Sequence, residues 1–99
     1  MIEKEELCNN IVKFLKETRP YDFNDCYSSE EEAYDNFYFL ISKSPKGPLL
    51  ELSEEIHEFL IYNDLRNKEM KEQFQMAVKL SYELNIYYNN FLEKENEIN

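Results

Sequence analysis

The chain has 99 residues, of which 42% are hydrophobic and 15% aromatic, and its formal net charge at neutral pH is −10. This length is typical of one domain, and the apolar content excludes a disordered acidic tail because it is sufficient to build a core. With one glycine and three prolines, the chain also lacks the turn residues of a multi-stranded β fold. We therefore expect a single all-α domain over residues 1–99.

The first predicted helix covers about residues 3–18. Its apolar residues recur at helical spacing, and its acids come early and its bases late, which suits the helix dipole. Pro20 ends this helix. The apolar stripe consists of Leu7, Cys8, Ile11, Val12 and Leu15. Residues 20–28 mix aromatic and polar side chains, and they predict a loop with aromatic anchors.

A second helix is predicted from about residue 29 to residue 42. Ser29 begins a capping box, in which the serine accepts a hydrogen bond from the third amide and Glu32 reaches back. Residues 37–41 are apolar all round, so this end is either buried on two sides or presents Phe39 to a partner. High β-propensity leaves a short strand open as an alternative there. The expected inner residues are Ala33, Tyr34, Phe37 and Ile41.

Residues 42–48 contain the only glycine and two of the three prolines, which indicates a linker. Pro48 suits the first turn of a third helix, where its missing amide hydrogen is not needed. Residues 63–64, Asn-Asp, end or bend this helix. Its expected inner residues are Leu49, Leu52, Ile56, Phe59 and Leu60.

The last helix is predicted from about residue 67 to about residue 94. Its apolar residues alternate in steps of four and three, and this seven-residue pattern forms a seam along the helix. The seam consists of Met70, Phe74, Ala77, Ser81, Leu84, Tyr88 and Phe91. Either the first three helices pack along this seam, or its far end protrudes and pairs with another chain. Together the elements predict a four-helix, bundle-like domain with a long C-terminal helix.

The negative charge is concentrated in two segments. Residues 20–42 contain six acids and no base, residues 49–64 contain five acids and no base, and residues 1–19 are neutral. This arrangement has a cost, because like charges four residues apart, such as Glu51 and Glu55, destabilise a helix by roughly 0.2–0.5 kcal/mol. One interpretation of the acidic surface is solvation alone. The other is a basic partner, attracted by complementary charge.

Tyrosines interleave with these acids, and aromatic anchors amid complementary charge are typical of tight interfaces. Direct binding of nucleic acid or of an anionic membrane is disfavoured, since both would be repelled. The candidate partner-binding residues are Asp22, Asp25, Tyr27, Glu31, Asp35, Phe39, Glu51, Glu54 and Glu58.

The catalytic and metal-binding patterns in the sequence are incomplete. Glu54 and His57 match half of a di-iron motif, but His57 is the only histidine. Asp22 begins a segment that resembles a calcium loop, in which Tyr27 stands where glycine is required. Cys26 has no local base to activate it. We therefore expect neither an enzyme nor a bound cofactor or metal.

A cytoplasmic location is expected, because the first residues carry acids where a signal peptide needs bases. No apolar run approaches the roughly 20 residues that span a bilayer. Cys8 and Cys26 are able to pair in principle, but two thiols in a reducing compartment are more often free and buried.

The sequence thus predicts a small acidic inhibitor that occludes the basic surface of a nuclease-like protein. Its carboxylates would stand where the phosphates of nucleic acid lie, as in an immunity protein, an antitoxin or a phage anti-defence protein. The alternative is a helical adaptor or assembly subunit that forms a homodimer through its last helix.

Overall fold

The computed structural model describes residues 2–43, 46–62 and 71–98. It contains the helices α1 (Lys4–Thr18), α2 (Pro20–Cys26), α3 (Glu30–Lys43), α4 (Lys46–Tyr62) and α5 (Lys71–Ile98). No strand occurs in these residues, so the all-α class is confirmed. The strand alternative for residues 37–41 is wrong, because this segment continues α3.

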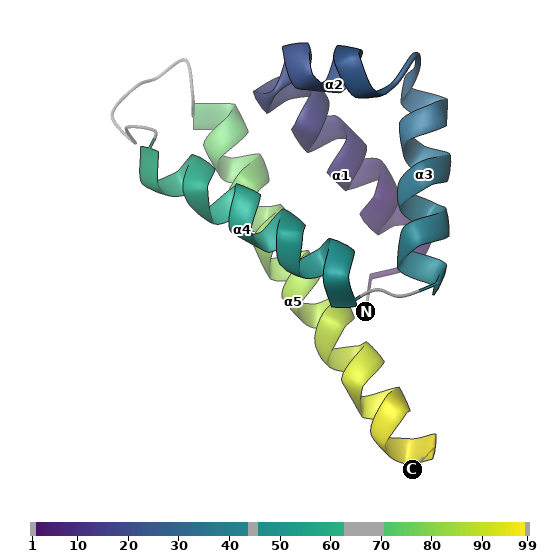
Figure 1. Cartoon of the computed structure of the whole chain (residues 1–99). Coiled ribbons are helices and arrows are strands. Elements are labelled where there is room, and N and C mark those ends of the chain that lie inside the picture. The colour runs from purple at the N-terminus through teal and green to yellow at the C-terminus, as the bar shows by residue number, and fades with distance from the viewer. Residues whose placement is uncertain (1, 44–45, 63–70, 99) are drawn as a thin grey trace.

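The four longer helices are neighbours in a ring. α1 packs against α3 and α5, and α4 packs against other sides of the same two helices. The short helix α2 lies across one end of α1 (Figure 1). α1 is therefore the helix with the most neighbours, and it touches α2, α3 and α5.

The core is built around α1, which supplies the buried residues Leu7, Cys8, Ile11, Val12 and Phe14. The predicted stripe is confirmed except at Leu15, which is half-buried while Phe14 is buried in its place. The Phe14 ring meets Phe59 of α4 edge-on, with 5.7 Å between the ring centroids. The ring centroid of Phe59 in turn lies 6.4 Å from that of Phe74 of α5. Aromatic contacts of this kind therefore link three helices and add to the stability gained from burial.

Residues 20–26 form α2, so the predicted loop is wrong for this stretch. Pro20 occupies the first helical position, where its fixed φ is suitable and its missing amide hydrogen costs nothing. The same proline that stops α1 therefore starts α2. The predicted aromatic anchoring is confirmed for Phe23, which is buried with its ring 5.3 Å from that of Tyr27.

Ser29 caps the start of α3, and Ser28 bonds to the side chain of Glu32 beside it. The Glu32 amide donates to Ser29 Oγ at 3.1 Å, as predicted for the capping box. The Glu32 carboxylate does not reach back to Ser29, and instead accepts hydrogen bonds from the hydroxyl and the amide of Ser28. These two bonds hold the pKa of Glu32 below its ordinary value, because they stabilise the ionised form.

The linker predicted for residues 42–48 is too long, because α3 continues to Lys43 and α4 begins at Lys46. Pro48 lies in the first turn of α4, as predicted. The predicted break at residues 63–64 and the predicted start of the last helix near residue 67 lie outside the described residues. The inner stripe of α4 is buried at Leu49, Leu52 and Ile56 and half-buried at Phe59 and Leu60.

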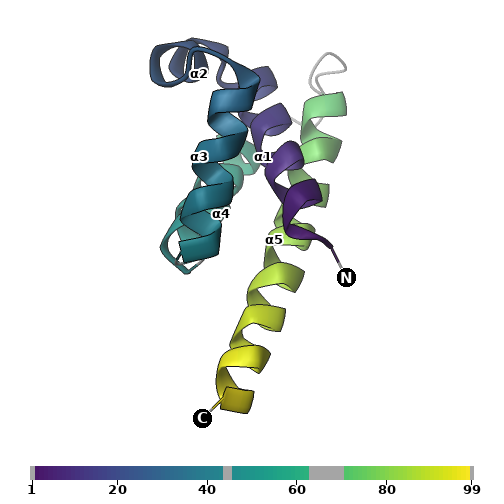
Figure 2. The ribbon, with the colours of Figure 1, turned by 90° about the vertical axis from the view of Figure 1, so that its right-hand side faces the viewer.

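α5 has 28 residues, which corresponds to about 42 Å of helix, whereas the longest dimension of the molecule is 47 Å. Its first half packs against α1 and α4, and its C-terminal end extends past the other helices in both views (Figures 1 and 2). The predicted packing of three helices along the whole seam is therefore not observed, because α5 packs only against α1 and α4.

The predicted seam of α5 is only partly buried. Ala77 and Leu84 are buried as expected, but Leu80, outside the seam, is also buried at 1% exposure. The half-buried seam residues are Phe74, Ser81, Tyr88 and Phe91. Met70 lies outside the described residues. In the described part of the chain, none of the helices is both long and apolar enough to cross a bilayer.

We expect the substitution Leu80→Ala to lower the free energy of unfolding by about 2–5 kcal/mol, because it leaves a cavity where α5 meets the core. Val78→Ala is the matched control, since Val78 is on the same helix and 51% exposed; its effect should stay within about 0.5 kcal/mol. Urea denaturation followed by circular dichroism measures both. Equal effects of the two substitutions would contradict the observed packing of α5.

Candidate protein-binding groove

A groove lies between α2, α3 and α4 and encloses about 490 Å³. It exists because α2 packs against α1 but does not reach α4. Apolar side chains from four helices form its floor and one rim, namely Leu15, Phe23, Phe37, Leu40 and Leu52. Leu40 is 36% exposed, so part of this apolar surface is in contact with water.

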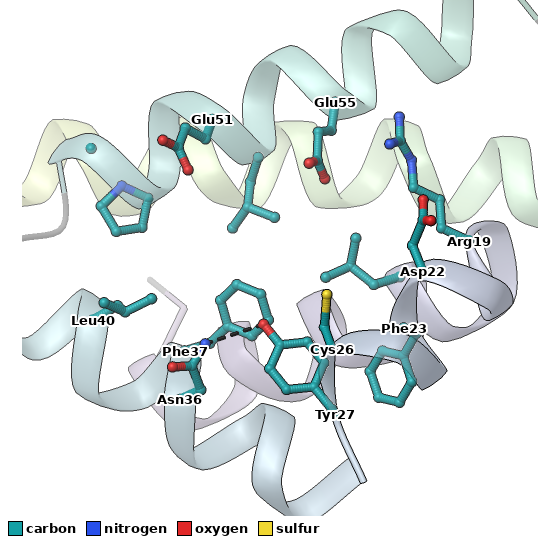
Figure 3. A pocket seen from close by; sticks show the side chains of 14 residues that line it. Arg19, Asp22, Phe23, Cys26, Tyr27, Asn36, Phe37, Leu40, Glu51 and Glu55 are labelled. Carbon is teal, nitrogen blue, oxygen red and sulfur yellow. Dashed lines mark hydrogen bonds between the residues drawn. The ribbon is translucent and has the colours of Figure 1, made fainter. Parts of the chain in front are cut away.

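Carboxylates stand on two opposite walls of the groove. Glu51 and Glu55, one turn apart on α4, project toward the gap, and Asp22 faces them from α2 (Figure 3). None of the three forms an ion pair with a described residue of the chain. Arg19 also lines the groove, and its guanidinium lies 3.8 Å from the carboxylate of Glu58. The groove is therefore apolar at its base and negatively charged at its walls.

Tyr27 fixes the wall between α2 and α3. Its hydroxyl accepts a hydrogen bond of 3.1 Å from the Asn36 side-chain amide. Its ring lies 5.3 Å from Phe23 and 6.0 Å from Phe37. Burial raises the pKa of Tyr27 above its ordinary value, because the phenolate is less well solvated there. Tyr27 is thus held in place by the fold, with its polar tip at the groove.

Cys26 is exposed and directs its sulfur into the same groove (Figure 3). Cys8 is buried in the core, and burial raises the pKa of its thiol to about 11. Both cysteines are free, so the expectation of free thiols is confirmed. The expectation that both are buried is wrong for Cys26.

The candidate residues predicted from the sequence do not form one continuous site. Asp22, Tyr27 and Glu51 line the groove, and Glu58 is beside it through its contact with Arg19. Asp25 and Glu54 are exposed but line neither this groove nor the hollows described next.

The other candidates lie in two hollows between α1 and α3. Asp35 and Phe39 share one hollow with Tyr34 and Tyr38. Phe39 is 61% exposed, as expected if it is presented to a partner, and the Lys43 ammonium lies 5.7 Å from its ring centroid.

Glu31 lines the second hollow, whose walls also carry Lys13 and Lys16. Lys16 forms a 2.7 Å ion pair with Glu30 at this place. The second hollow is therefore of mixed charge, unlike the groove.

Several residues of the groove are not among the candidates predicted from the sequence, including Phe23, Leu40 and Glu55. Phe23 and Cys26 are three residues apart and follow Pro20, which is a helix-start pattern, but the segment was predicted as a loop. Glu55 was noted only for its repulsion with Glu51, and no local signal marks Leu40, because their common position depends on how α3 and α4 pack.

The arrangement is suited to binding and offers no evident catalytic set. Within the described residues, no group of three or more histidine, cysteine, aspartate or glutamate side chains is placed to hold a metal ion. His57, exposed on α4, does not line the groove that contains Cys26. No protein-family model matches the chain, and no curated protein and no solved structure is significantly similar to it.

Because Cys26 is exposed and Cys8 is buried with a raised pKa, we expect iodoacetamide to modify only one thiol of the native protein. Mass spectrometry should show a single adduct on Cys26, and a second adduct only after unfolding in urea. The variant Cys26→Ser should remain unmodified in the folded state. Rapid modification of Cys8 in that variant would contradict the packing of α1.

Proposed function

We propose that this protein is a small acidic inhibitor that acts in the cytoplasm by binding a basic surface of another protein. In this proposal it has no catalytic activity, cofactor or metal, and it binds neither nucleic acid nor membrane directly. Its target is a nuclease-like toxin or defence protein, and the role is that of an immunity protein, an antitoxin or a phage anti-defence protein.

The observation that supports this proposal most is the set of unpaired carboxylates at the groove. Asp22, Glu51 and Glu55 are close to apolar surface and form no ion pair with described residues. Glu51 and Glu55 repel one another across one turn of helix. Such an arrangement costs stability in the free protein, and a basic partner would convert the repulsion into attraction.

The preference for a nuclease-like target follows from charge. Proteins that bind nucleic acid collect lysine and arginine where the phosphates lie. A rigid surface with exposed carboxylates can occupy such a site and exclude the nucleic acid. Long-range attraction between the two proteins would also speed their association.

Affinity capture from a lysate of the native host, with the protein as bait, tests this proposal. We expect a basic protein to be retained at low salt and released as salt rises, because screening weakens the attraction. The nuclease activity of the captured protein should fall when the purified inhibitor is added. Salt-insensitive recovery of the bait alone would contradict the proposal.

Charge reversal provides the matched control. Asp22→Lys with Glu51→Lys should weaken binding of the captured protein by about tenfold or more. The double substitution of Glu3→Lys and Glu93→Lys makes the same change in net charge. Glu3 precedes α1, Glu93 lies on α5, and both are exposed. That second pair should weaken binding much less.

A second candidate function, a homodimeric adaptor or assembly subunit, is favoured by exposed apolar and aromatic side chains on a charge-poor stretch of α5. Residues 80–92 contain a single charged residue, Glu83, which is buried and accepts a 2.7 Å hydrogen bond from Asn10. Tyr82 is 69% exposed and Leu92 is 36% exposed on this segment. Depletion of charge and exposed aromatic surface are typical of interface cores.

If α5 pairs with a second copy, sedimentation equilibrium should show a dimer that persists as salt rises. Leu92→Glu should shift this equilibrium toward monomer, because it places a charge in an apolar contact. Glu93→Gln is the control on the neighbouring exposed position. A monomer at every concentration tested would exclude this candidate.

A further inference from the structure

We propose that the groove between α2, α3 and α4 binds a basic amphipathic helix of the partner protein, which lies alongside α4. This inference rests on the proposed function and deepens it, because it names the element of the partner that is recognised. It also distinguishes a defined docking site from general attraction to an acidic surface.

The apolar floor favours an occupant with its own apolar stripe. Helix-in-groove recognition uses side chains spaced three and four residues apart on one face of the bound helix. Leu40, 36% exposed at the rim, provides apolar surface that such a side chain would cover.

The two charged walls require an occupant with bases on both flanks. Glu51 and Glu55 stand on the α4 wall and Asp22 on the α2 wall, with apolar side chains between them. An amphipathic helix has this arrangement when lysines or arginines border its apolar stripe. Its apolar residues would meet the floor while its bases meet the carboxylates.

The spacing along α4 matches that of two bases one turn apart on a helical occupant. Glu51 and Glu55 are four residues apart, so their Cα atoms are about 6 Å apart along the helix axis. Two bases at positions i and i+4 of a helix that runs beside α4 have the same spacing and would neutralise both carboxylates. Arg19 lies 3.8 Å from Glu58 and forms no ion pair with either of these two acids.

An anionic ligand is disfavoured at this site. The lining together with Glu58 contains four carboxylates and one guanidinium. A phosphate or an acidic peptide would therefore be repelled by the carboxylates of the α2 and α4 walls. The partner helix is thus distinguished from an uncharged apolar helix by its bases, and from a basic loop by its apolar stripe.

Two synthetic peptides of the same composition test the inference on the full chain. Each contains only leucine and lysine in about fourteen residues, which is about four helical turns. In the patterned peptide the leucines are spaced three and four residues apart, and in the scrambled peptide this spacing is lost. Isothermal titration calorimetry should give about tenfold tighter binding of the patterned peptide.

Two readouts locate the bound peptide. The patterned peptide should slow alkylation of Cys26, since the thiol lies inside the groove. Glu51→Lys should weaken binding of the patterned peptide by about tenfold. Glu54→Lys changes the charge equally, on the same helix but outside the groove, and should weaken it by less than about threefold.

Equal binding of the two peptides, or equal effects of Glu51→Lys and Glu54→Lys, would overturn the docking site. Both results would leave the proposed inhibitor standing as a protein that uses charge alone. If neither peptide binds, the docking site is overturned as well. The inhibitor itself fails separately, if no basic protein is captured from the host lysate.

Discussion

The rest of the structure depends on the burial of one face of α1 against three neighbours. Leu7, Ile11 and Phe14 of this face are almost completely removed from water, and α2, α3 and α5 all pack on the helix that carries them. The charged residues of α1, such as Glu6 and Lys13, lie on its exposed side and remain solvated. Residues 1–19 are neutral overall, so α1 adds no net charge to the surface that it shares with the acidic helices.

The distribution of charge follows from this arrangement. Bases of α1 balance acids of α3, as in the ion pair of Lys16 with Glu30 at 2.7 Å, while the Lys4 ammonium lies 4.6 Å from the centroid of the Tyr38 ring. Among the described residues, the acids of α4 form one ion pair, between Glu58 and Arg19 at 3.8 Å, and residues 49–62 contain four acids and no base. Most of the acids of α4 are therefore left without an ion pair among the described residues. This is the physical basis for proposing a basic partner on that side.

The groove is a consequence of the shortness of α2. With seven residues, α2 covers the end of α1 but leaves a gap before α4, so the core is not closed there. The side chains of Tyr27 and Asn36 hold the α2 and α3 walls together by a hydrogen bond of 3.1 Å. Rigid walls lower the entropy lost when a partner binds. An open, preformed and acidic groove is thus well suited to protein recognition.

Local sequence patterns determined most of the secondary structure. Helical spacing predicted the inner residues of α1 and α4, and Ser29 marked the cap of α3, because these features depend on neighbours within one or two turns. Pro20 shows where such reasoning fails, since a proline is compatible both with the end of one helix and with the first turn of another.

The site depended on tertiary structure. The excess of acids in residues 20–42 and 49–64 is visible in the sequence. The sequence does not show which of these acids line the same groove. Asp22 and Glu51 come together at the groove, whereas Glu31 and Asp35 lie in separate hollows. The sequence alone therefore determined an acidic all-α domain. The packing of α2, α3 and α4 decided the groove, because contacts between distant segments depend on how helices pack and not on the order of residues within each of them.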